Sequence, residues 1–389
     1  MFRFYNRLVV LALISLNFCC SDRGLISDSF TFLLIDSIKL PAFSYISPKS
    51  LCVRYLIKEN NEYLFWGNTP QNSIELYDIK AQEHLKSIAI PDEGPGSIKT
   101  IKAGFQVINF DTIYVNSLAP GELFLIDSSG RVYDQITFSY DTVRSYANNY
   151  LNLNTHIMGN VFMSGSRIIL PLREPYFKDK PDKNTIERIT KFRIYNLNTD
   201  ELTSSPIHID PDIYEIAEMY ILSSVVSMNG SYYYQYQNSA NLYHTCDLNN
   251  YTRHTFKSKY FTKFISENTY STPYENAKHS FYYYSLQADP FRDLLYRIVK
   301  LPASDPQLTD GFDEFYGSWD RGSIMVIDTN LSLLDEILFA THANYSWNEC
   351  FVGKKGFYLR RSSNHPHYSE SKITFDIFEF SELDNNQDI

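Results

Sequence analysis

The segment Glu62-Tyr-Leu-Phe-Trp-Gly67 is the first of six short runs of aromatic and β-branched residues along this chain. Residues of these types favour the half-buried surface of a pleated sheet. Each run is followed by a turn, a second run of similar composition and usually a third, as in successive antiparallel strands. The other five runs are Thr112–Ser117, Arg167–Leu172, Ser231–Tyr236, Ser280–Ser285 and Gly356–Arg361.

The spacing of these runs predicts the architecture. Counted from the second residue of each, successive runs are 50, 55, 64, 49 and 76 residues apart. This is the spacing of blades in a β-propeller, in which small antiparallel sheets repeat around an axis. We therefore predict an all-β fold, a six-bladed β-propeller that forms one domain over residues 21–389.

Composition and charge restrict the class of protein further. The chain is 44% hydrophobic and 16% aromatic, with 31 Tyr and 27 Phe, which suits a globular β-sheet protein with a large core. Its net charge is −10 and it has no cluster of Lys and Arg, which argues against nucleic acid or an anionic membrane surface as a partner. We find no nucleophile elbow, phosphate loop or metal-ligand spacing, and we expect no cofactor and no metal.

The N-terminus has the pattern of a lipoprotein signal peptide. Arg3 and Arg7 precede an apolar run, Leu8–Leu16, which is too short for a stable membrane span, and Cys19 and Cys20 follow it. We predict a signal peptide over residues 1–20 with lipidation at Cys20, and Cys19 as the alternative. The lipid would hold the protein in the cell envelope, at the outer membrane, with a periplasmic or a surface-facing orientation left open. An ordinary cleaved signal with incidental cysteines is the other interpretation.

Three cysteines follow the signal, Cys52, Cys246 and Cys350. An odd number cannot all pair within one chain, so at most one disulfide is expected. We predict that all three are buried thiols inside strands.

The last repeat is incomplete. It offers Gly356–Arg361 and Ile373–Phe380 and lacks an outer strand, whereas Phe30–Ile35 forms a spare strand before the first repeat. Pairing the spare strand with the last blade would close the ring and remove exposed sheet edges.

An Asp or Asn closes the middle strand of four repeats: Asp78, Asp127, Asn196 and Asp247. We expect these side chains to accept hydrogen bonds from the following backbone N–H groups and so to start the turns.

The fifth repeat, about residues 281–340, is enlarged. Its turn Asp289–Asp293 and the acidic, aromatic stretch Ala303–Gly322 interrupt the regular pattern. Long insertions in compact folds are often functional, and aromatic rings beside carboxylates suit carbohydrate. The candidate ligand-binding residues, here and at the propeller axis, are Asp289, Arg292, Arg297, Asp313, Glu314 and Trp319.

For two of these candidates we make a specific prediction. Arg297 lies between Tyr296 and Ile298 on a predicted inner strand, where a buried guanidinium would need a paired carboxylate or a ligand. Arg292 is expected to pair with Asp289 or Asp293 within the turn, which is mainly a structural role.

The six repeats, the N-terminal cysteine, the segment Pro91–Ile98 and the segment Asp289–Arg297 together resemble the six-bladed β-propeller lipoproteins of Bacteroidota. That group includes a branch known only as a domain of unknown function. The resemblance covers nearly the whole mature chain. It implies a membrane-tethered propeller in the cell envelope, and it implies no reaction and no catalytic residue.

The leading functional hypothesis is a non-enzymatic, lipid-anchored propeller that binds a ligand, such as a glycan, or a protein partner. One alternative is an envelope hydrolase or lyase that acts on glycans with paired carboxylates near the axis. The other alternative is a structural subunit of a membrane complex. No catalytic residue can be assigned from the sequence.

Overall fold

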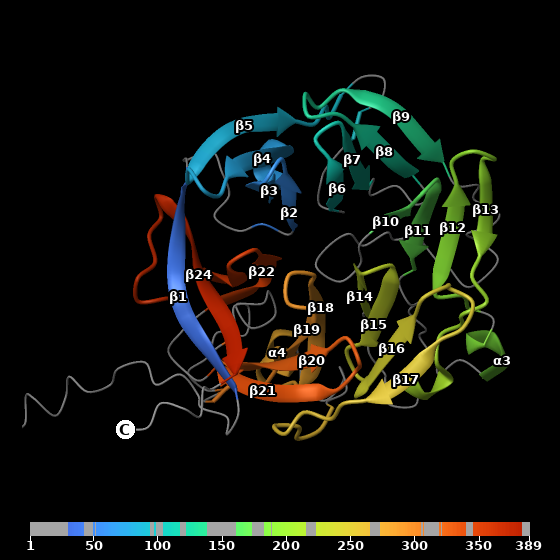
Figure 1. Ribbon diagram of the computed structural model, residues 1–389, viewed down its shortest axis with the longest axis vertical. Coiled ribbons are helices and arrows are strands. Elements are labelled where there is room, and N and C mark those ends of the chain that lie inside the picture. The colour runs from blue at the N-terminus through green and yellow to red at the C-terminus, as the bar shows by residue number, and fades with distance from the viewer. Residues whose placement is uncertain are drawn as a thin grey trace, which may run out of the picture.

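The structure, a computed structural model, describes residues 30–42, 50, 52–93, 97–98, 104–116, 122–137, 161–172, 183–187, 189–214, 223–264, 273–304, 306, 319, 321–339 and 345–382. Six sheets of four antiparallel strands surround a central axis (Figure 1). The prediction of an all-β, six-bladed propeller is therefore confirmed.

Within each blade, the strands run from the axis to the rim in chain order, except that the last blade takes its rim strand from the N-terminus. The first three blades are β2 (Val53–Lys58), β3 (Asn61–Asn68), β4 (Ser73–Asp78) and β5 (Glu83–Ala89); β6 (Phe105–Asn109), β7 (Thr112–Asn116), β8 (Glu122–Ile126) and β9 (Val132–Thr137); and β10 (Phe162–Ser164), β11 (Arg167–Pro171), β12 (Phe192–Asn196) and β13 (Glu201–Ser204).

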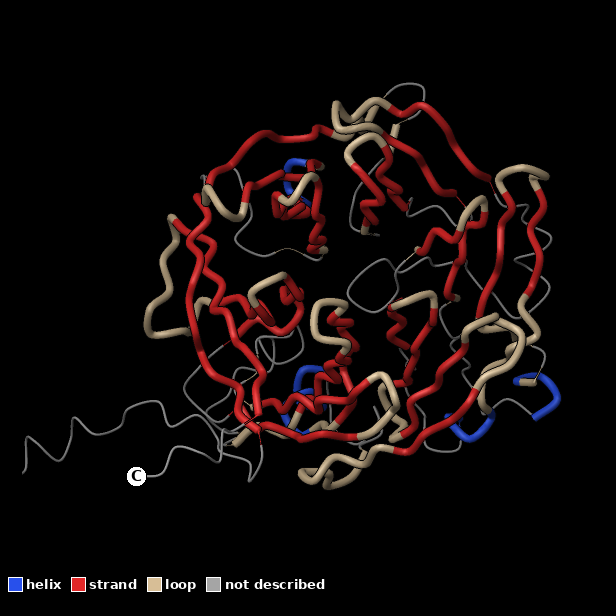
Figure 2. Tube along the Cα trace, in the orientation of Figure 1, coloured by secondary structure: helices blue, strands red, loops and turns tan. Residues whose placement is uncertain are grey.

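The last three blades are β14 (Ser223–Met228), β15 (Ser231–Tyr236), β16 (Asn241–Thr245) and β17 (Thr252–Thr255); β18 (Tyr282–Asp289), β19 (Leu294–Lys300), β20 (Gly322–Asp328) and β21 (Leu333–Phe339); and β22 (Tyr345–Gly353), β23 (Gly356–Arg361), β24 (Lys372–Glu382) and β1 (Phe30–Pro41). Short helical segments lie in the connections between strands (Figure 2): Thr69–Gln71, α3 (Lys183–Ile186), Pro211–Tyr214 and α4 (Pro273–His279).

Five of the six aromatic runs form the second strand of a blade, and the fifth run forms a first strand. In blade five, Phe281–Ser285 overlaps β18, whereas the second strand is β19. This difference explains why the last two sequence spacings are uneven. Blade five has four described strands like the other blades, and its extra length lies between the end of β19 at Lys300 and the start of β20 at Gly322.

The innermost strand of most blades was not predicted from the sequence. In β2, the six residues mix charged, aromatic and aliphatic side chains and most are only partly buried, so its sequence lacks the apolar signal of a fully buried strand. β14 and β22 are mostly buried, so incomplete cover does not explain why these two strands were missed.

The N-terminal strand closes the ring, as predicted. β1 pairs with β24 antiparallel from Phe30 opposite Glu382 to Pro41 opposite Lys372 (Figure 1, left). The ring of Phe32 stacks on Phe378 with a centroid distance of 5.3 Å and meets Phe339 of blade five edge-on at 5.6 Å. The strand therefore covers the edge of the last blade and joins the core shared by blades five and six.

The Asp and Asn residues at the ends of the middle strands start the turns as predicted. In each turn a backbone N–H donates to the side-chain oxygen of the Asp or Asn. The pairs are Ala81 to Asp78 at 2.8 Å, Ser129 to Asp127 at 2.8 Å, Asn198 to Asn196 at 2.9 Å and Asn249 to Asp247 at 2.9 Å. These contacts are local, so the sequence alone was enough to predict them.

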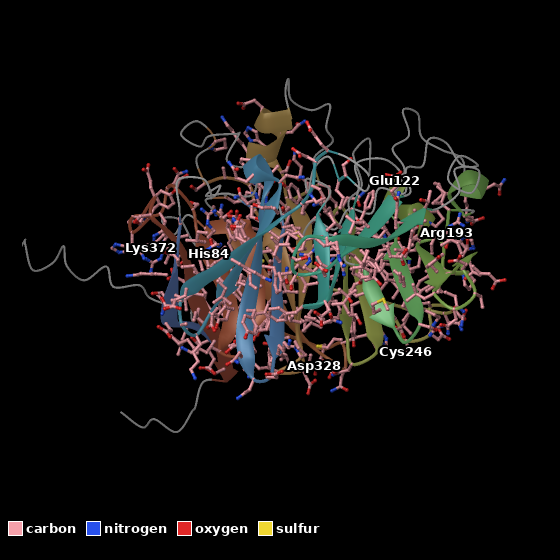
Figure 3. All side chains as sticks on the ribbon, turned by 90° about the horizontal axis from the view of Figure 1, so that it is seen from above. His84, Glu122, Arg193, Cys246, Asp328 and Lys372 are labelled. Carbon is pink, nitrogen blue, oxygen red and sulfur yellow. The ribbon has the colours of Figure 1, made fainter. Side chains whose placement is uncertain are left out.

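The two faces of the ring differ in their connections. One face, which we call the tight-turn face, carries the short turns between first and second strands, such as Glu59–Asn60 and Asn229–Gly230, and those between third and fourth strands. Figure 3 shows Cys246 and Asp328, which lie in or next to turns of the latter kind, on one side, and Glu122, where β8 begins, on the other. The longer connections lie on the opposite face.

The three cysteines of the propeller are free thiols. Cys52 and Cys350 are buried, as predicted. Cys246 is exposed because it lies in the turn after β16, and the prediction of a buried thiol was wrong for this residue. In the part of the chain that the structure describes, no helix has the length and apolar character needed to cross a membrane.

Candidate functional site

A cavity of about 380 Å³ lies at the propeller axis. It is lined by the innermost strands of five blades, β2, β6, β14, β18 and β22, which converge there in Figure 1. The lining residues are Val53, Arg54, Tyr55, Leu56, Ile57, Gln106, Ser227, Gln287, Ala288, Pro290, Phe291, Cys350, Phe351 and Val352. Pro290 and Phe291 belong to a turn on the tight-turn face, so the cavity reaches toward that face.

Three aromatic side chains belong to the apolar part of the lining, together with aliphatic residues such as Leu56 and Ile57. Tyr55 stacks on Phe351 with a centroid distance of 5.6 Å, and the ring of Phe291 meets Tyr55 edge-on at 6.5 Å. Phe291 is 41% exposed, which is unusual for a large apolar side chain. These rings give the cavity flat apolar surfaces against which a ligand could pack.

The polar part of the lining is contributed by Arg54, Gln106, Ser227 and Gln287. Arg54 donates from Nε to Oε1 of Gln106 at 2.9 Å and from a terminal nitrogen to its neighbouring carbonyl, that of Val53, at 2.8 Å. Among the described residues of the lining, Arg54 carries the only charge and there is no Asp or Glu. Tyr55 of the same lining donates from its hydroxyl to Oε2 of Glu62 at 2.6 Å, so a carboxylate lies directly behind the lining.

The sulfur in the cavity wall is that of Cys350. Burial raises the pKa of its thiol to about 12, and Sγ donates to the carbonyl of Trp347 at 3.3 Å. The thiol is therefore protonated at neutral pH, and a protonated thiol is a poor nucleophile. The described lining therefore supplies no thiolate nucleophile. It also lacks the paired carboxylates that a glycan hydrolase would need.

Asp289 and Arg292, two of the predicted candidates, shape the mouth of this cavity. The buried carboxylate of Asp289 accepts hydrogen bonds from the backbone N–H groups of Phe291 at 3.0 Å and Arg292 at 3.1 Å, from Nη1 of Arg292 at 3.1 Å and from the hydroxyl of Tyr296 at 2.9 Å. Nη2 of Arg292 donates to the carbonyl of Lys354 in blade six at 3.0 Å. Arg292 thus pairs with Asp289, as the turn chemistry predicted, and together they hold Phe291 at the cavity.

Arg297 lies on β19, away from the described lining of the cavity. It is fully buried, and its guanidinium donates to Gln235 Oε1 and to the carbonyls of Ser239, Ala240, Asn241 and Phe256 at 2.6 to 3.3 Å. Its carbon Cζ lies 3.6 Å from the ring centroid of Tyr283. The expectation of a carboxylate or ligand partner was therefore wrong, because neutral oxygens of blade four take up its donors.

Trp319, another predicted candidate, is 1% exposed. Its ring stacks on Trp347 at 5.7 Å and meets Tyr284 edge-on at 4.5 Å within the core of blades five and six. Its ring is therefore covered by protein and fastens the β19–β20 connection to that core. Asp313, Glu314, Cys19 and Cys20 lie outside the described residues.

The sequence interpretation missed Arg54, Gln106, Ser227, Gln287 and Phe291. Arg54, Gln106 and Ser227 lie on innermost strands that were not recognised, and Gln287 lies on β18 just beyond the fifth aromatic run. One signal was available: Asn229-Gly230 immediately precedes the fourth aromatic run, and Asn-Gly between two strands is a strong hairpin indicator. It would have revealed β14 and directed attention to the residues before each run.

Comparison with known proteins places the chain among propellers. A crystal structure of a DUF4221 family member from Bacteroides vulgatus is similar with a TM-score of 0.75 and 19% identity, over 92% of this chain and all of that one. A candidate exported protein of Bacteroides fragilis is similar with a TM-score of 0.55 and 9% identity, over 93% of this chain and 98% of that one. At these identities the similarity establishes the fold alone. No curated protein matches the sequence significantly.

The family signature covers most of the propeller. The domain of unknown function (DUF4221) matches residues 28–338, from the closing strand β1 through blades one to five. The resemblance to unknown-function propellers of Bacteroidota is therefore confirmed, and the chain belongs to the DUF4221 family.

Proposed function

We propose that this protein is a non-enzymatic, lipid-anchored binding module of the cell envelope whose axial cavity takes up a small ligand. The observation that carries the proposal is the cavity itself, which combines three aromatic rings with a cation, two amides and a hydroxyl from five blades. Pockets that bind small molecules have this composition, with apolar walls and a few convergent polar groups. At about 380 Å³, the cavity is near the lower end of their usual size.

The envelope location is supported by the signal-peptide pattern before residue 21 and by the exported character ascribed to the similar Bacteroides fragilis protein. The binding role is favoured over glycan hydrolysis because the described lining has no carboxylate pair. It is favoured over a purely structural role because the cavity is open and Phe291 stays 41% exposed beside it, which packing of the blades does not require.

The proposal can be tested by blocking the cavity. The full-length protein, purified in detergent, would be screened by thermal shift against small sugars, sugar acids, amino acids and aromatic acids. The variant Ser227→Trp fills the cavity, whereas Ser204→Trp places the same side chain on the exposed rim strand β13. We expect at least one compound to raise the melting temperature of the wild type and Ser204→Trp and to leave Ser227→Trp unchanged.

Two results would contradict the proposal. One is the absence of any stabilising compound, which would favour a structural subunit. The other is stabilisation that survives in Ser227→Trp, which would place the ligand elsewhere.

A further inference from the structure

We infer that the rim strand β1 is the surface through which this protein contacts the lipid bilayer, by the exposed side chains of Leu33, Leu34 and Ile35. We call these three residues the β1 patch. The inference rests on the lipid anchor of the proposed function. It adds the part of the propeller that meets the membrane and the orientation that this contact gives to the ring.

Exposed aliphatic side chains gather on β1 and on the rim strands beside it. Leu33, Leu34 and Ile35 are consecutive, and they are 48%, 50% and 44% exposed. The rim strands of the two neighbouring blades each add one exposed leucine, Leu333 on β21 at 41% and Leu85 on β5 at 47% (Figure 1). Single exposed leucines are ordinary on a protein surface, whereas a contiguous apolar patch marks a surface that contacts a partner or a membrane.

A β-bulge explains why three consecutive side chains are exposed. The register of β1 on β24 shifts between Leu34 and Asp36, so Ile35 has no partner in this pairing. Before the bulge, Phe32 packs in the core of blades five and six, and after it Ile38 packs in the core of blades six and one. The strand changes sides at the bulge, and the β1 patch lies outside both cores.

The edge of β1 is poorly suited to a strand from a second copy of the protein. β1 is the outermost strand of its sheet, a position where strands of other molecules can pair. The bulge, the exposed Lys39 and the terminal Pro41 are features that discourage such pairing. The strand therefore combines apolar side chains with a blocked backbone edge, which favours lipid over another sheet as the occupant.

The charges beside the β1 patch have both signs. Asp36 forms an ion pair of 2.7 Å with Lys355, and Glu379 lies opposite Leu33 while Lys39 follows on the same strand. These charges balance, so the contact does not require an anionic lipid. We therefore expect the patch to meet zwitterionic lipid through its apolar side chains.

The predicted lipid anchor keeps the β1 patch close to a membrane. Nine residues, 21–29, separate Cys20 from Phe30, the first residue of β1. Such a segment spans at most about 35 Å, because each residue extends the chain by no more than about 3.6 Å. A short link gives the patch a high effective concentration at the bilayer, so that a small apolar surface is sufficient for contact. The side chains would enter the level of the headgroups, where water still reaches the backbone of the strand.

Contact at β1 gives the ring a defined orientation. β1 lies on the rim, between the two faces of the propeller (Figure 1). The tight-turn face, toward which the axial cavity reaches, would then stand to the side of the membrane surface. The cavity would remain accessible to a ligand in solution.

Quenching of tryptophan by brominated lipid tests the contact. The full-length lipoprotein with Leu34→Trp would be reconstituted into phosphatidylcholine vesicles. The control Leu197→Trp places the same side chain at a 39% exposed position in the turn after β12, across the ring from β1 (Figure 1). The native Trp66, Trp319 and Trp347 are at most 1% exposed, so the introduced residue reports on the surface. We expect brominated acyl chains to reduce the added emission of Leu34→Trp and to leave that of Leu197→Trp unchanged.

A second variant tests whether the apolar surface causes the contact. Adding Leu33→Asp to Leu34→Trp should abolish the loss of emission, because a carboxylate is costly to transfer into the bilayer. A high salt concentration should leave the loss of Leu34→Trp emission unchanged, because salt screens exposed charges and does not weaken an apolar contact. Melting curves would verify that each variant is folded.

Three results would overturn the inference, and they can be told apart. Equal loss for Leu34→Trp and Leu197→Trp, or no loss for either while the protein stays on the vesicles, would remove the β1 contact and leave the anchor intact. Emission of Leu34→Trp that shifts to shorter wavelength without quenching would mean that a second copy covers the patch. Failure of the wild type to float with the vesicles would contradict the lipid anchor itself, and with it the inference.

Discussion

Arg297 donates a hydrogen bond of 2.6 Å from Nε to Oε1 of Gln235, and this contact joins blade five to blade four. The other guanidinium nitrogens donate to four backbone carbonyls of blade four and its exit. Burial lowers the pKa of Arg297 to about 10, so the group remains protonated at neutral pH. A cation that satisfies five oxygens of a neighbouring blade fixes the position of one blade against the other.

Replacing Arg297 with Met should therefore lower the free energy of unfolding by about 3 kcal/mol or more, because five buried oxygens lose their donor. Urea unfolding followed by tryptophan fluorescence would measure the change. Arg253→Met is the matched control. Arg253 is 48% exposed where it pairs with Asp210, and its loss should cost less than about 1 kcal/mol. Equal losses for the two variants would contradict the interblade role of Arg297.

The closing strand should contribute strongly to stability. Phe32 is buried in the core of blades five and six, so Phe32→Ala should destabilise the protein by about 3–5 kcal/mol. The neighbouring Leu34 is 50% exposed on the same strand, and Leu34→Ala should change stability by less than about 1 kcal/mol. Urea unfolding would compare both variants, and a Phe32→Ala protein as stable as wild type would show that closure by β1 is dispensable.

The turn at the cavity mouth depends on the charge of Asp289. Asp289→Asn replaces one acceptor oxygen with a donor that faces Arg292 and Tyr296, and we expect a loss of about 1–3 kcal/mol in stability. Asp293→Asn provides the control four residues later, where the exposed carboxylate accepts one hydrogen bond from Asn229. Thermal unfolding should show a clearly lower midpoint for Asp289→Asn alone. A midpoint equal to that of the control would mean that the paired turn does not stabilise the fold.

Glu75 should make stability depend on acid pH. Burial alone would raise the pKa of this carboxyl group, but hydrogen bonds from Ser73, Ser87 and further partners outweigh burial and hold the pKa below its ordinary value of 4.5. A folded-state pKa below the unfolded value stabilises the protein above pH 4.5, and this contribution is lost as the pH falls from there through the folded-state value.

The free energy of unfolding of the wild type should therefore fall below pH 4.5, and Glu75→Gln should fall less over the same range. Glu83→Gln, an exposed position on β5, should behave as wild type. Urea unfolding at a series of pH values would measure these slopes. Parallel curves for Glu75→Gln and the wild type would show that Glu75 does not carry the acid sensitivity.

If the proposed lipid anchor exists, membrane attachment should depend on the cysteines at the end of the predicted signal peptide. Replacing both Cys19 and Cys20 with Ala should move the protein from the membrane fraction to the soluble fraction on cell fractionation. Replacing Cys20 alone should have the same effect if it is the lipidated residue, and Cys19→Ala would then serve as the control. Retention of the double variant in the membrane fraction would exclude a lipid anchor at these positions.

Several features of this fold depend on residues that are close in the sequence, and the sequence was sufficient to predict them. The aromatic and β-branched runs predicted strands because β propensity and alternation act over a few residues. The turns after Asp78 and Asp127 followed from a side chain that reaches its own neighbours. The closing strand Phe30–Ile35 could be identified because the last repeat lacked a rim strand, which is a matter of counting.

The residues that line the cavity could not be predicted from the sequence in this way. Arg54, Gln106, Ser227 and Gln287 come from four blades and are separated by long stretches of chain, so only the curvature of the ring brings them together. The same holds for Arg297, whose partners lie on a neighbouring blade, and for Trp319, which the packing of blades five and six covers.

The sequence by itself therefore determined the number of blades, the turns and the closure, because each depends on short-range chemistry or on the count of strands. The tertiary structure decided which polar residues face the axis and which are buried between blades. That choice depends on how neighbouring sheets pack, and packing between distant segments leaves no periodic signal in the sequence.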